Sequence, residues 1–440
     1  MPLNCETPST TVPAIFPPVT LASVICAIAG AAIVARASAI TEPAQVLFMT
    51  HPPCLVRKYL TSKPRLPVSA GAPATGRRLV ATALMWLAVS LANAQSAPRD
   101  PSPHPFSITR SDPALDMLIA PDAKLQTVAS GFGFVDGPVW IRGRDSTEGY
   151  LLASSIIDNV LYKVTAAGKV SVFLDRAGYS GEDFANTGKL AQIGRAHVLL
   201  MGPGCAGVDG QGRVVWCAGQ DLAIKRLEKD GTRTVLAQGF EGKHFNGPND
   251  VAIAADGAIY FTDSDVGLRG GIRSPQVQMP DSVWRWKDGK VTLAVSREQL
   301  GAEPNGIALS PDDKYLYLSA GTMSPDPKIM RYPVHADGSV GAGETFTHGR
   351  GIGDGMKTDR AGNLWSTEPV PGAVRITSPT GTLLGLLEMP TTGDAEPRKT
   401  TCASSLAFGG DDAKTLYITA CEHIYAIPLR APGTLEGPAH

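Results

Sequence analysis

The sequence predicts an all-β protein built from a repeated strand–turn–strand unit. This unit can be laid along the chain six times, and the copies after the first have a tight turn rich in Gly, Asp or Asn. The runs on either side of these turns are rich in β-branched and aromatic residues, which favour strands. All-strand repeats of roughly 40–50 residues are typical of a β-propeller. We therefore expect six blades of four strands each, with a generic β-sandwich as the alternative.

The clearest copy covers residues 246–267 and reads NGPNDVAIAADGAIYFTDSDVG. A strand at Val251–Ile253 leads into the Asp256–Gly257 turn, and a second strand follows at Ile259–Thr262. The other copies keep this order of lead residue, strand, turn and strand, and the lead residue is polar in all copies except the second. The six lead residues are Asp136, Ala206, Asn249, Asn305, Asp354 and Ser405.

The two ends of the repeat region predict how the ring closes. A short strand is expected near Lys124–Val128, before the first copy, whereas the sixth copy shows three strands and ends at Ile424–Pro428. The N-terminal strand can supply the missing outer strand of the last blade, which would hide an open sheet edge. We expect residues 120–432 to form the propeller.

Composition restricts the class of partner. The chain has 440 residues, 47 Gly, 35 Pro and a formal net charge of −1. Many Gly and Pro residues suit a turn-dense β protein, and the near-zero charge gives no electrostatic footprint for nucleic acid. We expect a small-molecule partner and no nucleic acid.

The first 104 residues lack the strand–turn period. Residues 77–94 have a basic start, an apolar run and an Ala-Asn-Ala end, which is the pattern of a secretory signal peptide. We expect residues 1–76 to be a disordered leader or an over-extended reading frame, and residues 95–119 to be a linker. A membrane anchor at Val19–Ala35 is the alternative. The favoured interpretation is an exported, periplasmic or secreted protein with no stable membrane anchor.

Cysteine spacing supports export. Cys205 and Cys217 are placed symmetrically about one predicted hairpin turn, and Cys402 and Cys421 about another. Residues equidistant from such a turn face each other about 4.5–5.5 Å apart at Cα, which is within disulfide range. We expect the disulfides Cys205–Cys217 and Cys402–Cys421, with four free buried thiols as the alternative.

The lead residues carry the predicted chemistry. In a propeller, the starts of the innermost strands meet around one axis, so residues distant in sequence converge there. Two carboxylates and two carboxamides at one point suit Ca²⁺, and less strictly Mg²⁺ or Mn²⁺, whereas Zn²⁺ is less natural without His or Cys. The alternative is that each is an Asx residue capping a strand start. The predicted metal ligands are Asp136, Asn249, Asn305 and Asp354.

Five motifs carry a family resemblance: DGPVW, the NGPND…YFTD run, EPNGIALSPDDKYLY, GDGMKTDRAGNLW and SLAFGGDDAKTLYIT. Together they resemble the senescence-marker-protein/gluconolactonase/luciferin-regenerating-enzyme family over about residues 120–430. The resemblance implies a six-bladed propeller that hydrolyses lactones or related esters with one divalent metal. It implies the same four ligands as the repeats.

Two departures from the family pattern bear on the substrate. The family's first ligand is usually Glu in an EGPxW motif, whereas Asp136 is one methylene shorter. The second blade usually offers an Asn before its Gly, and Ala206 stands there instead. A polar substrate contact is expected to be lost in that blade, which makes typical sugar lactones less certain substrates.

The predicted mechanism is metal-assisted hydrolysis with Asp354 as the general base. Candidate substrate-binding residues are His244, Asp263, Arg269 and Ser405, each of which could instead be a loop or turn residue. A different class of function is also open: a non-catalytic propeller that binds a ligand or protein around a structural metal. An esterase or phosphotriesterase using the same site is a third possibility.

Overall fold

A computed structural model describes residues 104–144, 147–182, 189–193, 196–265, 277–321, 326–349, 353–369, 372–391 and 402–438. The predicted signal peptide at 77–94, the alternative anchor at Val19–Ala35 and the candidate Arg269 lie outside these residues. No helix within these ranges is long and apolar enough to cross a membrane.

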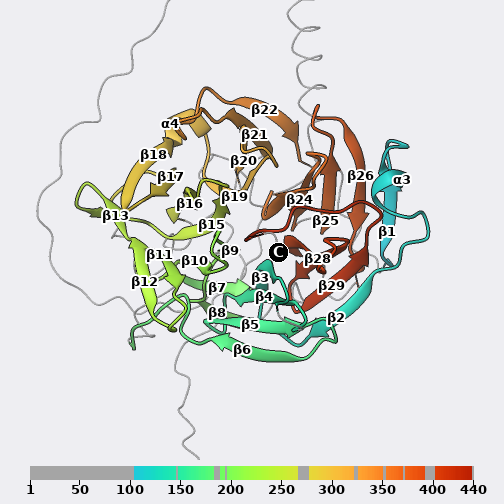
Figure 1. Ribbon diagram of the computed structural model, residues 1–440, viewed down its shortest axis with the longest axis horizontal. Helices are drawn as coiled ribbons and strands as arrows, with labels where there is room; N and C mark the ends of the chain where they lie inside the picture. The colour runs from blue at the N-terminus through green and yellow to red at the C-terminus, as the bar shows by residue number, and fades with distance from the viewer. Residues whose placement is uncertain are drawn as a thin grey trace, which may run out of the picture. The chain divides into compact units, whose positions relative to one another are not determined.

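Six antiparallel sheets stand around a common centre, as Figure 1 shows. The predicted six-bladed propeller is confirmed. Blade 1 consists of β3 (Val135–Ile141), β4 (Tyr150–Ser155), β5 (Val160–Thr165) and β6 (Val170–Leu174). Blade 2 consists of β9 (Ala206–Val208), β10 (Val214–Ala218), β11 (Ala223–Leu227) and β12 (Arg233–Ala237). Blade 3 consists of β15 (Pro248–Ile253), β16 (Ile259–Asp263), β17 (Ser282–Lys287) and β18 (Lys290–Val295).

The remaining blades follow the same order from the inner strand to the outer strand. Blade 4 consists of β19 (Pro304–Leu309), β20 (Tyr315–Ala320), β21 (Lys328–Pro333) and β22 (Glu344–His348). Blade 5 consists of β23 (Met356–Thr358), β24 (Leu364–Glu368), β25 (Ala373–Thr377) and β26 (Leu383–Glu388). Blade 6 has the inner strands β27 (Ala403–Gly409), β28 (Thr415–Ala420) and β29 (His423–Pro428).

The ring closes with a strand from the N-terminal side of the chain. β2 (Gln126–Ser130) pairs antiparallel with β29 and is the outer strand of blade 6. The two ends of the domain therefore share one sheet, and the outer edge of β29 is covered. This confirms the predicted closure, with the strand two residues further along than expected.

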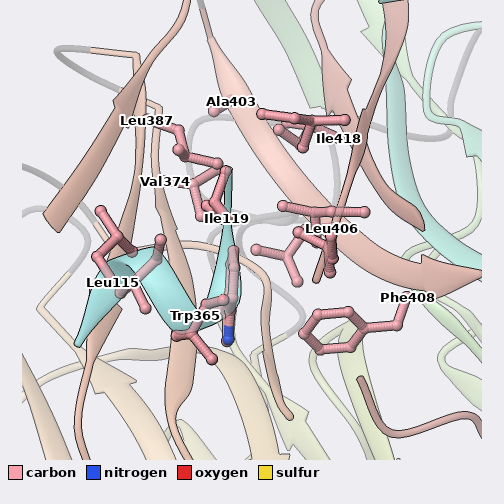
Figure 2. Close-up of a cluster of buried hydrophobic side chains, with 14 of the residues drawn as sticks. Leu115, Ile119, Trp365, Val374, Leu387, Ala403, Leu406, Phe408 and Ile418 are labelled. Carbon is pink, nitrogen blue, oxygen red and sulfur yellow. The ribbon is translucent and has the colours of Figure 1, made fainter. Parts of the chain in front are cut away.

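The stretch expected to be a linker contains ordered structure, which corrects that expectation for residues 104–119. β1 (Ser107–Arg110) adds a fifth strand to blade 5 by pairing with β26. α3 (Leu115–Leu118) follows, and Leu115 and Ile119 are fully buried in the hydrophobic cluster between blades 5 and 6. Figure 2 shows both side chains in one cluster with Trp365, Val374 and Leu406. The apolar residues of this stretch are the physical reason for its order.

Short hairpins and one short helix lie between successive blades along the chain. The long insert before blade 2 forms the hairpin β7 (Lys189–Ile193) and β8 (Ala196–Leu200), and a small hairpin, β13 (Gly239–Phe240) and β14 (Lys243–His244), precedes blade 3. The single-turn helix α4 (Arg297–Leu300) precedes blade 4 and begins with a capping box in which Ser296 and Gln299 exchange hydrogen bonds.

One predicted disulfide is present and the other is not. Cys402 and Cys421 are bonded, with their Cα atoms 5.4 Å apart. Cys205 and Cys217 are both free and buried, although the backbone N–H of Cys217 donates to the Cys205 carbonyl. The prediction of a Cys205–Cys217 disulfide is therefore wrong. The Cys205 side chain points toward Gly137 of blade 1, whereas Cys217 packs in the core shared by blades 2 and 3.

Candidate metal-binding site

The predicted ligands occupy equivalent places at the start of the innermost strands. Asp136, Asn249 and Asn305 are each the second residue of their strand, and Asp354 lies two residues before β23. The strand pairing of β3 is irregular directly after Asp136, and in β15 and β19 the residues Asn249 and Asn305 lie within the irregular stretch. Such bulges turn a side chain away from the regular in-and-out alternation of a strand. The repeat in the sequence therefore corresponds to a repeated local geometry.

Contacts join these residues across blade boundaries. The side-chain amide of Asn249 donates a hydrogen bond to Oδ1 of Asn305. Asn305 also hydrogen-bonds the side chain of Asp354, and Asp354 interacts electrostatically with Asp136. Asp136 is 5 % exposed, and the other three are partly buried. The four side chains thus lie in one group contributed by blades 1, 3, 4 and 5.

The two carboxylates of this group share an unfavourable environment. Burial, together with the nearby Asp250, raises the pKa of Asp136 to about 7, although the Gly137 N–H opposes the shift. Burial and the charges of Asp136 and Asp250 raise the pKa of Asp354 well above its usual value. Within the described ranges, neither Asp136 nor Asp354 forms an ion pair with Lys, Arg or His. A cation at this point would relieve their mutual repulsion.

The donor set fits a hard divalent cation. Two carboxylates and two amide oxygens are the ligand types that Ca²⁺ takes, with Mg²⁺ and Mn²⁺ also compatible. Among the described residues, no cluster of three or more His, Cys, Asp and Glu side chains forms a metal site. The candidate site contains two carboxylates only, and amides complete it.

Close approach of neighbouring blades holds the group together. A Cβ atom on Gly355 would fall 2.1 Å from Oγ of Ser405, and one on Gly306 would fall 2.0 Å from the carbonyl oxygen of Asp354. The N–H of Cys205 donates to the carbonyl of Asn249 over 2.7 Å. Glycine at positions 306 and 355 therefore lets blades 4, 5 and 6 meet at the site.

Asp250 and Ser404 are two neighbours of the site that sequence reasoning missed. Asp250 is 2 % exposed; its Oδ1 accepts from Val251 N–H at 2.7 Å and its Oδ2 from Ile307 N–H at 3.0 Å. It thereby ties β15 to β19 next to the predicted ligands Asn249 and Asn305. Ser404 donates to the Val135 carbonyl and also hydrogen-bonds Asp136. The PND motif contained a signal for Asp250, whereas nothing local distinguished Ser404 from Ser405.

The candidate substrate-binding residues differ in their surroundings. Asp263 is completely buried and accepts hydrogen bonds from the Asn246 and Gly247 N–H groups, which makes it a loop anchor rather than the expected substrate contact. His244 is partly buried in β14, and its Nδ1 lies 2.6 Å from the Phe245 carbonyl oxygen.

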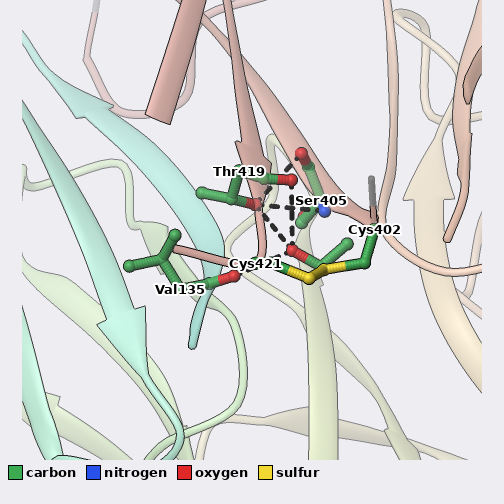
Figure 3. Close-up of a disulfide and its surroundings, with 6 residues drawn as sticks. Val135, Cys402, Ser405, Thr419 and Cys421 are labelled. Carbon is green, nitrogen blue, oxygen red and sulfur yellow. Dashed lines mark hydrogen bonds between the residues drawn. A yellow bond between two sulfur atoms is a disulfide. The ribbon is translucent and has the colours of Figure 1, made fainter. Parts of the chain in front are cut away.

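Ser405 lies at the site but is 3 % exposed. Figure 3 shows its hydrogen bonds with Thr419, next to the Cys402–Cys421 disulfide. The disulfide therefore pins the start of the innermost strand of blade 6, which lies beside Asp136. Ala206, the lead residue of blade 2, is buried and apolar and adds no donor.

Fold and site together define a class: a six-bladed propeller with acidic and amide side chains gathered where the innermost strands begin. The family model described as the SMP-30/gluconolactonase/LRE-like region matches residues 134–422. The chain belongs to this family.

Several known proteins are similar to this chain in sequence or in structure. A gluconolactonase from Zymomonas mobilis subsp. mobilis is 29 % identical over 339 residues, which is 74 % of this chain and 87 % of that protein. A gluconolactonase structure from Xanthomonas campestris is 26 % identical with a TM-score of 0.59, over 74 % of this chain and 98 % of the other. Regucalcin from Agrobacterium tumefaciens, a calcium-binding protein, is 18 % identical with a TM-score of 0.51, over 76 % of this chain and 98 % of the other. The similarity to regucalcin is a similarity of fold.

Proposed function

We propose that the protein is a hydrolase that opens lactones or related carboxylic esters, with a divalent cation held by Asp136, Asn249, Asn305 and Asp354. One observation carries the proposal: Asp136 and Asp354, which have no cationic partner among the described residues, lie with two amides, and the four side chains come from four blades. The gluconolactonases of Zymomonas mobilis and Xanthomonas campestris, at 29 % and 26 % identity, support the reaction class.

Bound at this site, the cation would act as a Lewis acid toward the ester carbonyl and would lower the pKa of a water molecule. Asp354 takes the proton from the attacking water as the new C–O bond forms, and the bond from the carbonyl carbon to the ring oxygen breaks. The proton passes to that oxygen, which leaves as a hydroxyl group. Asp136 serves mainly as a ligand, and the side chains of Asn249 and Asn305 supply amide oxygen ligands from blades 3 and 4.

Ca²⁺ is the cation that we propose first, because amide and carboxylate oxygens at flexible spacing suit its coordination. Mg²⁺ and Mn²⁺ are the alternatives, and Zn²⁺ fits least well in the absence of His or Cys donors. We also propose that the protein is exported. The Cys402–Cys421 disulfide supports an oxidising compartment.

The test is a substrate panel with and without a chelator. Five- and six-membered aldonolactones, an aryl ester and a phosphotriester are assayed with the metal-loaded protein, the EDTA-treated protein, and the Asp354→Ala and Asp337→Ala variants. Asp337 is an exposed turn residue of blade 4 that bonds Ser339, so it is a matched carboxylate control. We expect lactone hydrolysis that EDTA and Asp354→Ala abolish and that Asp337→Ala retains.

Two results would contradict the proposal. Absence of hydrolysis across the panel would favour a non-catalytic binding propeller. Hydrolysis that survives both the chelator and Asp354→Ala would place the chemistry elsewhere. Turnover of the aryl ester or phosphotriester without turnover of lactones would reassign the substrate class at the same site.

A further inference from the structure

The C-terminal tail after β29 runs across the ring on the side of the hairpin turns, opposite the strand starts that carry the candidate site. The Arg360 N–H donates to the Pro432 carbonyl, and the Gly433 N–H donates to the Ala413 carbonyl. Arg142 of blade 1 donates to the Pro438 carbonyl over 2.9 Å. The tail therefore contacts blades 1, 5 and 6, and Figure 1 shows it reaching the middle of the ring.

Glu436 of this tail lies in the channel and bonds to opposite blades. Its Oε2 accepts from the Val208 N–H of β9 over 2.9 Å, and its Oε1 pairs with Nζ of Lys357 in β23 over 2.9 Å. Blades 2 and 5 lie opposite each other in the ring of six blades, so a side chain bonded to both lies near the axis. The Lys357 and Glu436 side chains are only 16 % and 19 % exposed.

The tail packs closely against the inner strands of the propeller. A Cβ atom on Gly207 would fall 2.8 Å from Oε2 of Glu436, and one on Gly433 would overlap the Phe408 ring at 1.9 Å. Cavities of about 350 Å³ and 280 Å³ flank the tail, and both are lined by Glu436 and Gly437. The pair is therefore built into the channel and is not a rim contact.

Lys357 connects this end of the channel to the candidate site. Although burial opposes it, the Glu436 and Asp250 carboxylates raise the pKa of Lys357 above its usual value. Asp250 in turn accepts hydrogen bonds from Val251 of β15 and Ile307 of β19, each two residues after one of the Asn residues of the group. The Lys357 ammonium group thus interacts with Glu436 on one side and with Asp250 on the other, and Asp250 interacts with the site carboxylates.

We propose that Lys357 and Glu436 are positioning residues for the candidate metal site. The tail carboxylate holds and neutralises the Lys357 ammonium group. Lys357 also interacts with Asp250, whose hydrogen bonds to Val251 and Ile307 hold the strands that carry Asn249 and Asn305. The metal-binding part of this inference rests on the proposed function. Without Glu436, only Asp250 would oppose the Lys357 charge, and the channel would gain one unit of positive charge that repels a cation at the site.

The test compares the full-length wild type with Glu436→Gln, with the double variant Glu436→Gln/Lys357→Met, and with the control Glu344→Gln. Glu344 pairs with Arg331 on the outer strand of blade 4 and is 63 % exposed, so the control removes an equivalent charge far from the axis. Ca²⁺ affinity is measured by titration calorimetry with the metal alone. Thermal unfolding of the same four proteins is measured in EDTA.

We expect Glu436→Gln to weaken Ca²⁺ binding about fivefold, the effect of one added unit of net positive charge across a partly screened channel. Addition of Lys357→Met should restore the affinity to the wild-type value or above it, because it removes that charge. A tail with a purely structural role would leave the double variant as weak as Glu436→Gln, and this result would overturn the inference. So would an unchanged affinity in Glu436→Gln.

The unfolding measurements separate this inference from the proposed function. If the wild type binds no divalent cation, the proposed metal site fails, and the pairing is judged in EDTA alone. We then expect Glu436→Gln to lower Tm by about 5 °C and Lys357→Met to recover at least half of that loss. A double variant that unfolds at or below the Tm of Glu436→Gln contradicts the pairing. If Glu436→Gln does not fold, recovery of folded protein by Lys357→Met supports the pairing, and failure of both contradicts it.

Discussion

The side-chain amide of Asn249 in blade 3 donates a hydrogen bond to Oδ1 of Asn305 in blade 4, which is 56 residues further along the chain. Both residues lie within an irregularity in the pairing of their strand. Asn305 also reaches Asp354 of blade 5, so it contacts two of the other three members of the group. This central place makes Asn305 the residue whose loss should disturb the site most.

We expect Asn305→Ala to weaken divalent-cation binding by about 10- to 100-fold and Asn249→Ala to weaken it less. The physical reason is that Asn305 both offers an oxygen ligand and orients Asp354, whereas the Asn249 side chain is seen to hydrogen-bond one member of the group, Asn305. Titration calorimetry measures both affinities. Gln211→Ala, which removes an exposed amide in the turn of blade 2, serves as the control. Equal affinities for Asn305→Ala and wild type would contradict this assignment.

The raised carboxylate pKa values predict a pH dependence of stability in the metal-free protein. The pKa of Asp136 is about 7 in the folded chain against an ordinary value of 3.8. The folded state therefore binds the proton more tightly, and stability falls as pH rises from about 4 to about 7. In EDTA we expect Tm to decrease over this range, and Asp136→Asn should flatten the decrease.

Cation binding should show the opposite trend, because the metal competes with protons for Asp136 and Asp354. We expect Ca²⁺ affinity to increase from pH 6 to pH 8, measured by calorimetry in matched buffers. If the Tm of the metal-free protein instead rises from about pH 4 to about pH 7, with the same slope in Asp136→Asn, the raised pKa of Asp136 is refuted.

The Cys402–Cys421 disulfide closes a loop with a sequence separation of 19. Replacing both cysteines with Ala should lower the free energy of unfolding by about 3 kcal/mol, as measured by urea denaturation without reductant. Peptide mapping provides the internal control. Cys205 and Cys217 should be alkylated in the unfolded protein without reduction, whereas Cys402 and Cys421 should require it. Alkylation of all four without reduction would rule out the bond.

Ring closure predicts different effects for deletion of two outer strands. Deleting residues 126–130 removes β2, exposes the edge of β29 and breaks the closure of the ring. We expect this variant to be unfolded or aggregated in gel filtration and circular dichroism. Deleting residues 107–110 removes β1 but leaves the four strands of blade 5, so this matched control should fold with a lower Tm. A folded monomer lacking β2 would contradict closure by the N-terminal strand.

Local sequence patterns predicted the blades because each strand–turn–strand unit has its own signal. Asp256–Gly257 has the turn chemistry, Gly257 adopts a φ of 84°, and the flanking residues pair as expected from Ile253 with Ile259. The same spacing placed Asp136, Asn249, Asn305 and Asp354 at strand starts. Symmetry about a turn predicted both cysteine pairs, but it contained no information on side-chain direction. Cys205 turns toward Gly137, and the second disulfide is therefore absent.

The sequence by itself determined the number of blades, the closing strand and the residues that line the start of each innermost strand, because these depend on period and turn chemistry. Only the tertiary structure decided which neighbours surround them. Asp250, Lys357 and Glu436 come from blades 3 and 5 and from the tail. Their alignment along the channel depends on the closure of the ring, and contacts of this kind leave no local pattern in a sequence.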